Sequence, residues 1–293
     1  MFPDEPAARR WFEETRWPDG KVLCPRCDEP NVVEVKNGKP MPWWCRECKK
    51  YFSVKLGTVM ERSRIPLRKW VIGLYLMTTS LKGVSSMKLH RDLGITQASA
   101  WFMSQRIREG WMTDPERLSG TVEIDESYFG GKDKNRPKDM RSGQRGVAGK
   151  AAVMGMRERE TGRIRAMPVA STDMGTLQDE VFANIRPGSQ IYTDDFGSYR
   201  GLDGMFYKHW SVKHSARQCV DGMAHTNGIE SFWSMLKRGY HGTHHHFSHK
   251  HLGRYVSEFA GRQSGRDLGK LEQMELLART MDGRRLTYRD LTG

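Results

Sequence analysis

The run Thr-Val-Glu-Ile-Asp-Glu-Ser-Tyr at residues 121–128 places an acidic residue, Asp125, inside a β-rich pattern. A second strand-like run, Gln-Ile-Tyr-Thr-Asp at residues 190–194, ends on Asp194, and thirty-five residues separate that acid from Glu230. Two carboxylates at neighbouring strand ends and a third on a helix can hold two divalent cations, which prefer oxygen ligands. Such a pair of cations can activate an attacking oxygen and stabilise a leaving one during phosphodiester exchange. The three acids therefore indicate chemistry on a nucleic-acid backbone.

The two strand acids have competitors nearby. Glu123 and Glu126 compete with Asp125, although strand alternation places Glu126 on the opposite face of the sheet. Asp195 competes with Asp194, and either residue would also suit a turn. We prefer Asp194, because it continues the short strand that precedes it.

Glu230 has an alternative explanation of its own. The stretch from Asn227 to Glu230 matches a capping box, in which Asn227 accepts from the backbone and Glu230 reaches back. However, Lys237 lies seven positions beyond Glu230, almost two helical turns, and so shares its face of the helix. Because a lysine beside a metal-binding glutamate can contact phosphate, we expect Glu230 and Lys237 to belong to the catalytic site.

Residues 1–60 contain two Cys-x-x-Cys pairs separated by seventeen residues, a spacing typical of structural zinc sites. Between the pairs, residues 32–35 alternate, Asn37 and Gly38 predict a tight hairpin turn, and Trp43 begins a return strand. This pattern predicts a zinc ribbon in which four thiolates leave no open position for catalysis. The alternative is two pairs of free buried thiols. The predicted Zn²⁺ ligands are Cys24, Cys27, Cys45 and Cys48.

Residues 61–118 are predicted to be helical, with Pro66 opening the first helix and Gly83 interrupting the pattern. Two further helices, over residues 84–92 and 96–111, suggest a DNA-binding helix-turn-helix, and an ordinary helical hairpin is the alternative. On the last helix we expect several polar side chains to face partly outward, namely Gln97, Ser99, Gln105, Arg106 and Arg108.

Strand-like runs alternate with helical ones in residues 119–252, which predicts an α/β core of the ribonuclease-H kind that carries the three acids. The strands are expected over 121–128, 151–158, 163–169 and 189–193, and the helices over 173–185 and 228–240. Residues 253–293 are expected to form a basic helical C-terminal tail. The predicted fold class is therefore a multidomain α+β and α/β chain, consisting of zinc ribbon, helix-turn-helix and catalytic core.

The charge of the chain favours a polyanionic partner, because the formal net charge is +13 and the pI is about 9.6. Residues 130–150 hold seven Lys or Arg against two Asp, which suits a flexible DNA-contacting loop or a solvated surface loop. The N-terminus lacks the apolar core of a signal peptide, and the longest apolar stretch, residues 70–77, is too short to cross a bilayer. We therefore expect a cytoplasmic, nucleoid-associated protein of a bacterium or archaeon, with no membrane partner.

The chain resembles bacterial insertion-sequence transposases of the DDE type with an N-terminal zinc ribbon, in particular the family numbered fifteen-ninety-five. The stretches that carry the resemblance are residues 16–27, 122–131, 193–199 and 225–239. It implies a retroviral-integrase-like ribonuclease-H fold and two Mg²⁺ or Mn²⁺ ions held by Asp125, Asp194 and Glu230. Some members of that family are described with asparagine as the third residue, so Asn227 stays open as a direct participant.

Together these features predict a transposase that binds terminal inverted repeats, cleaves DNA with water and joins the freed 3′-OH to target DNA. Because two ends must be joined together, we expect a homodimer or a higher oligomer on double-stranded DNA. Two alternatives remain. A non-catalytic regulator built on the ribbon and helix-turn-helix would leave the three acids unexplained, and a ribonuclease-H-like nuclease would cleave without joining.

Overall fold

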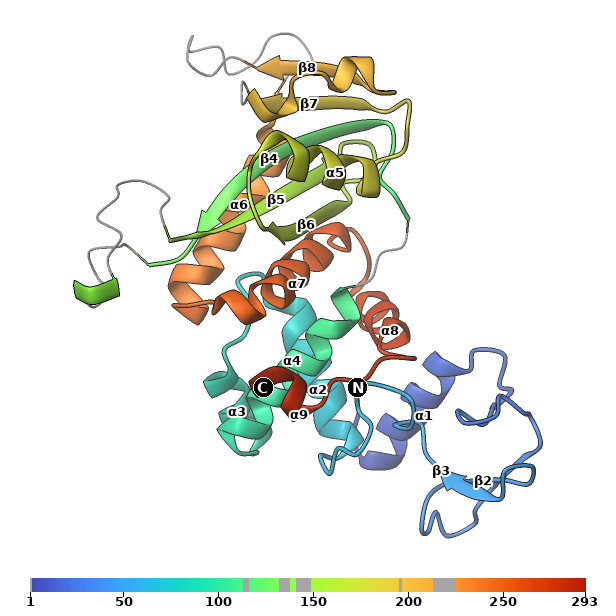
Figure 1. Ribbon diagram of the computed structural model, residues 1–293. Coiled ribbons are helices and arrows are strands. Elements are labelled where there is room, and N and C mark those ends of the chain that lie inside the picture. Colours follow the sequence, from blue (N-terminus) through green and yellow to red (C-terminus); the bar gives the residue numbers. More distant parts are fainter. Residues whose placement is uncertain (1, 113–115, 132–137, 141–148, 195–196, 213–224) are drawn as a thin grey trace. The chain divides into compact units, whose positions relative to one another are not determined.

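The computed structural model describes residues 2–112, 116–131, 138–140, 149–194, 197–212 and 225–293 (Figure 1). The chain forms two compact units, and both ends of the chain belong to the first one. The first unit comprises Met1–Ser80, Val84–Thr113 and Leu268–Gly293. The second comprises Leu81–Gly83 and Asp114–Asp267. No helix in the described ranges is long and apolar enough to cross a membrane.

The first unit opens with helix α1 (Glu5–Arg16), which the sequence analysis does not predict, followed by a small antiparallel sheet in the order β1-β2-β3. The strands are β1 (Val32–Glu34), β2 (Trp43–Cys45) and β3 (Lys50–Phe52). The predicted tight hairpin turn is wrong, since residues 35–42 connect β1 to β2. Gly38 does turn the chain, with φ +64 and a hydrogen bond from its N–H to the carbonyl of Val35, but within this longer connection.

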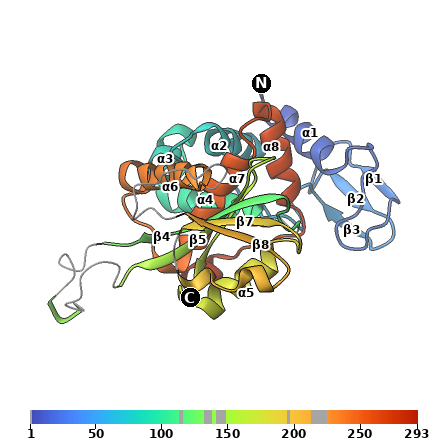
Figure 2. The same cartoon turned by 90° about the horizontal axis from the view of Figure 1, so that it is seen from above.

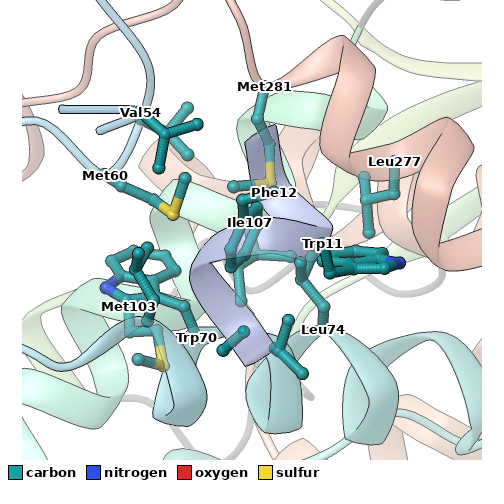
Figure 3. Packing of buried hydrophobic residues seen from close by; sticks show 14 of the residues in the cluster. Trp11, Phe12, Val54, Met60, Trp70, Leu74, Met103, Ile107, Leu277 and Met281 are labelled. Carbon is teal, nitrogen blue, oxygen red and sulfur yellow. The ribbon is translucent and has the colours of Figure 1, made fainter. Parts of the chain in front are cut away.

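Five further helices complete the first unit: α2 (Leu67–Thr79), α3 (Ser86–Leu93), α4 (Gln97–Trp111), α8 (Lys270–Thr280) and α9 (Tyr288–Thr292). The core joins side chains from distant parts of the sequence, as Figure 3 shows for Trp11, Trp70, Ile107 and Leu277.

The C-terminal range does not form one separate tail. Helix α7 (Leu252–Ser264) belongs to the second unit, whereas α8 and α9 belong to the first. Met274, Leu277 and Met281 are buried in the first-unit core, and Asp282 forms an ion pair with Arg16 at the end of α1, at 2.6 Å. Burial of these apolar side chains explains why the last helices fold onto the N-terminal part of the chain.

Helices α3 and α4 are joined by a short turn at Gly94, which has φ +55, and this geometry fits both a helix-turn-helix and an ordinary helical hairpin. Only some of the side chains that were expected to face outward do so. Gln97 is exposed and Ser99 is partly exposed, but Gln105, Arg106 and Arg108 are buried. The buried arginines find partners inside the same unit: Arg106 donates to the carbonyl of Leu286 and stacks on Phe102, and Arg108 donates to Ser104.

The second unit is a five-stranded mixed sheet in the order β6-β5-β4-β7-β8. Strands β4 (Thr121–Phe129), β5 (Ala151–Glu158) and β6 (Ile164–Val169) are antiparallel neighbours. Strands β7 (Gln190–Asp194) and β8 (Lys208–Val212) continue the sheet parallel to β4, and β8 is a strand that the sequence analysis does not predict. Short helical turns cover Lys138–Met140, Gly197–Tyr199, Leu202–Gly204, Tyr240–His244 and His249–His251.

Alternate residues of β4 line two different cores. Val122 and Ile124 are buried together with residues of α5 (Met174–Asn184) on one face. Phe129 is buried on the other face with residues of α6 (Asn227–Gly239) and α7. Figure 2 shows α5 on one side of the sheet and α6 and α7 on the other. The odd-numbered acids of β4, Glu123 and Asp125, therefore face α6.

Candidate active site and zinc site

Strand pairing places two of the predicted acids side by side. Strands β4 and β7 pair in parallel, and the last residue pair of this ladder is Glu123 opposite Tyr192. Asp125 and Asp194 are each two residues further along, so both lie on the same face of the sheet as that pair. The sequence alone cannot give this register, which depends on which strands pair. Asp195, the competitor of Asp194, lies outside the described residues.

Helix α6 brings the third acid over the same strands. Gly155 of β5 pairs with Asp125, and a Cβ atom on Gly155 would lie 2.5 Å from the indole ring of Trp233. The missing side chain therefore lets α6 pack closely on the sheet. This role of Gly155 was not predicted, although a glycine inside a strand pattern can indicate the close approach of another element. Glu230 lies on α6, and its charge makes a small contribution to the raised pKa of Asp125.

The site carries an excess of negative charge. Burial raises the pKa of Asp125 to about 6, and Asp194 and Glu230 add to this effect. The backbone N–H of Glu126, which donates to Asp125 at 2.8 Å, acts in the opposite direction. Burial also raises the pKa of Glu126 to about 8, with further contributions from Asp125 and Asp194. Closely placed carboxylates with raised pKa values are typical of functional sites.

These carboxylates fit divalent cations by their chemistry, because hard cations take oxygen ligands and would offset the repulsion between the acids. The possible ligand atoms of these carboxylates lie further apart than the sulfur atoms of the four cysteines. Among the residues that the structure describes, Cys24, Cys27, Cys45 and Cys48 form the one set of three or more potential ligands whose atoms all lie within 4.8 Å of one another.

The start of α6 differs from the predicted capping box. The helix begins at Asn227, and Thr226 is its N-cap residue. The Thr226 hydroxyl donates to the carboxylate of Glu230 at 2.9 Å. The partner of Glu230 in this hydrogen bond is therefore Thr226, whereas the predicted capping box pairs Glu230 with Asn227. Asn227, Glu230 and Lys237 are all exposed, at positions that share one face of the helix. The structure thus leaves Asn227 and Lys237 accessible beside Glu230 without assigning either a role.

The four cysteines match the geometry of a tetrahedral zinc site. Cys24 and Cys48 have their sulfur atoms 3.7 Å apart, and Cys27 and Cys45 have theirs 3.6 Å apart. A Zn–S bond of about 2.3 Å implies sulfur atoms about 3.8 Å apart around a tetrahedral ion. Cys24 and Cys45 are buried, which suits a structural rather than a reactive site.

Matches to two known protein families identify the class of protein, the zinc-ribbon transposases of insertion sequences. Residues 3–51 match the transposase zinc-ribbon domain, and residues 117–263 match the ISXO2-like transposase domain. The chain belongs to this ISXO2-like family of transposases, as the resemblance in its sequence predicts.

Two relatives carry similar names. The chain is 27% identical over 249 residues to an uncharacterised protein of the transposable element ISH50 from Halobacterium salinarum, covering 81% of this chain and 83% of that protein. It is 30% identical over 76 residues to an uncharacterised transposase-like protein of Haemophilus influenzae, covering 26% of this chain and 61% of that one. A simian T-cell lymphotropic virus intasome structure, in complex with the PP2A regulatory subunit B56 gamma, matches 65% of each chain with 12% identity. The TM-score of this match is 0.31.

Proposed function

We propose that the chain is a metal-dependent polynucleotidyl transferase that binds the terminal inverted repeats of its element, cleaves DNA and joins 3′-OH ends to target DNA. The observation that carries this proposal is the β4–β7 register, which aligns Asp125 with Asp194 on the face that α6 covers with Glu230. We propose that the second unit is a ribonuclease-H-like, integrase-like core, and the strand order β6-β5-β4-β7-β8 with its strand directions supports this proposal.

In this proposal Asp125, Asp194 and Glu230 hold two Mg²⁺ or Mn²⁺ ions through carboxylate oxygens. When bound, the cations activate the attacking oxygen and stabilise the leaving one. Lys237, exposed on the same helix, neutralises and orients a DNA phosphate, and Asn227 at the helix start is the alternative third residue. The loop at residues 130–150, most of which lies outside the described residues, supplies further positive charge.

The zinc ribbon and the α3–α4 pair are proposed to bind the terminal inverted repeats, with Zn²⁺ stabilising the ribbon. Gln97, which is exposed, and Ser99, which is partly exposed, are polar residues at the start of α4 that suit a contact with DNA. Because the two ends of an element are joined together, we propose a homodimer or higher oligomer on DNA. Transposition acts on chromosomal DNA, so the proposed location is the cytoplasm, at the nucleoid.

The test is a strand-transfer assay with a pre-cut inverted-repeat end, a supercoiled target and Mg²⁺. A transferase gives joined product, a nuclease gives cleaved product alone, and a DNA-binding regulator gives neither. Asp125→Asn serves as the control for contaminating nuclease, because it removes the charge that a hard cation requires. Absence of joined product with wild-type protein that binds its ends would contradict the proposal.

A further inference from the structure

A fully buried carboxylate, Glu123, lies two residues before Asp125 on the same face of β4. Its Oε1 atom accepts a hydrogen bond from Arg159 Nε at 2.7 Å and lies 3.4 Å from His225 Nδ1. Its Oε2 atom accepts the backbone N–H of Ile229, in the first turn of α6, at 2.9 Å. Because a buried charge is costly unless it is paired, these partners hold Glu123 and tie β4 to the start of α6.

Arg159 extends this link to the third element of the site. Its guanidinium donates to the carbonyl of His225 at 2.5 Å, in the segment that leads into α6. The same guanidinium lies over the ring of Tyr192, 4.4 Å from its centroid. Tyr192 is on β7, two residues before Asp194. Glu123 and Arg159 therefore contact all three elements that carry the candidate metal ligands.

Gly228 shows how closely the helix start approaches this pair. A Cβ atom on Gly228 would lie 2.6 Å from Glu123 Oε2 and closer still to the guanidinium of Arg157. Such a distance is far below van der Waals contact, so a side chain at this position would displace the carboxylate of Glu123 or the guanidinium of Arg157. The glycine is thus required by the contact between the helix and the buried carboxylate.

We propose that Glu123 and Arg159 are positioning residues that hold the start of α6 against β4 and β7 and thereby set the position of Glu230 relative to Asp125 and Asp194. The inference rests on the proposed function, in which these three acids hold divalent cations. Neither Glu123 nor Arg159 is required to touch the cation or the DNA. Loss of a group that orients a metal ligand typically weakens metal affinity about 10- to 100-fold.

The experiment measures Mn²⁺ binding to the full-length, zinc-loaded protein by electron paramagnetic resonance, which requires no turnover. In Glu123→Gln the amide cannot accept from both Arg159 and Ile229, because one of its two ends is a donor. We expect Mn²⁺ to bind about tenfold or more weakly, with the circular dichroism spectrum unchanged. The matched control is Glu158→Gln. Glu158 is a buried carboxylate of the same sheet that accepts from Ser119 and Thr161, on the face away from α6, and its variant should keep wild-type Mn²⁺ affinity.

A second variant approaches the same contact from the helix. Gly228→Ala favours helix formation but introduces the Cβ that collides with Glu123, so it should weaken Mn²⁺ binding in the same way. Its control is Gly253→Ala in α7, where the nearest atom would lie at an ordinary 3.6 Å.

Wild-type Mn²⁺ affinity in both Glu123→Gln and Gly228→Ala would overturn the inference, as would an equal loss in Glu158→Gln. Asp125→Asn separates this failure from failure of the proposed function. If Asp125→Asn binds Mn²⁺ normally, the acidic site itself is wrong. If it abolishes binding while the two positioning variants do not, only the positioning role is wrong.

Discussion

Asp125 illustrates a conflict between stability and function within one residue. Its ionised form is disfavoured by burial and by Asp194 and Glu230, and this raises its pKa from 3.8 to about 6. An acid with a raised folded-state pKa contributes stability below its unfolded pKa and loses that contribution as the pH rises through about 6. Without a bound cation, the charged site therefore destabilises the second unit at neutral and alkaline pH.

The first prediction follows from this conflict. Asp125→Asn should abolish strand transfer while making the metal-free protein more stable at pH 8. A rise in pKa of this size corresponds to an upper limit of roughly 3 kcal/mol in the free energy of unfolding. Urea unfolding without added divalent cations, at pH 8 and at pH 4, measures the effect, and the gain should disappear at pH 4. Equal stability of variant and wild type at pH 8 would contradict the interpretation that ionised Asp125 destabilises the metal-free protein.

The second prediction separates Glu230 from Asn227. Glu230→Gln keeps a side-chain oxygen that can accept from the Thr226 hydroxyl, so α6 should start at the same residue. The substitution removes the charge that a cation needs, and we expect strand transfer to fall by at least about 100-fold with DNA binding retained. Asn227→Ala should transfer nearly normally, because Asn227 is an exposed residue that does not cap the helix. The reverse result would assign the third role to Asn227.

At the scale of elements, the ribbon is too small to be held by its apolar core alone. Its three strands have three residues each, and two of its four cysteines are buried. A metal that binds only the folded form supplies folding free energy to such a module. Most of the core of the first unit lies among helices such as α1, α2, α4 and α8 (Figure 3), and the ribbon strands contribute only Cys45 and Phe52 to its fully buried residues.

The third prediction is that Cys24→Ser releases zinc and weakens recognition of the inverted repeats, while the second unit stays folded. Elemental analysis gives the zinc content, and a gel-shift assay with inverted-repeat DNA gives the affinity. The sheet of the second unit shares none of the ribbon strands, so its near-ultraviolet signals and Mn²⁺ binding should persist. Purified wild-type protein without zinc, or a zinc-free variant with normal end binding, would show that the ribbon has another role.

At the scale of the whole molecule, the net charge of +13 favours association with a polyanion of any sequence. Part of this positive charge is already neutralised by ion pairs within the protein. Arg159 is paired with Glu123, and Arg262 with Glu258, in both cases with a fully buried carboxylate. Binding of DNA must therefore rely on exposed cations such as Lys237 and Arg238.

The fourth prediction is a steep dependence of DNA affinity on salt. Neutralisation of about six phosphates would lower the affinity by roughly 10³-fold between about 50 and 200 mM salt, because bound cations are released from the DNA. Fluorescence anisotropy with labelled inverted-repeat and unrelated duplexes measures both slopes. Lys237→Ala should reduce the slope by about one for both duplexes. An affinity independent of salt would argue against phosphate contacts as the main source of binding.

Local patterns in the sequence predicted many of the separate parts of this protein, although not α1, β8 or the place of the C-terminal helices. The cysteine spacing predicts the ribbon, and strand and helix patterns predict α5, α6 and four of the five strands of the second sheet. They also identify the three acids as candidates, although their catalytic role stays a prediction. Such features depend on neighbours within a few residues, so they can be read without knowledge of the fold.

Only the tertiary structure decided how these parts meet. The short strand β8, the β4–β7 register, the close approach of α6 at Gly155 and Gly228, and the pairing of Glu123 with Arg159 all involve distant segments. Arg106 is another example. Its sequence position predicted a partly outward side chain, but the side chain is buried and donates to the carbonyl of Leu286. These outcomes depend on which surfaces exclude water together and which buried charges find partners, and a one-dimensional pattern does not contain that information.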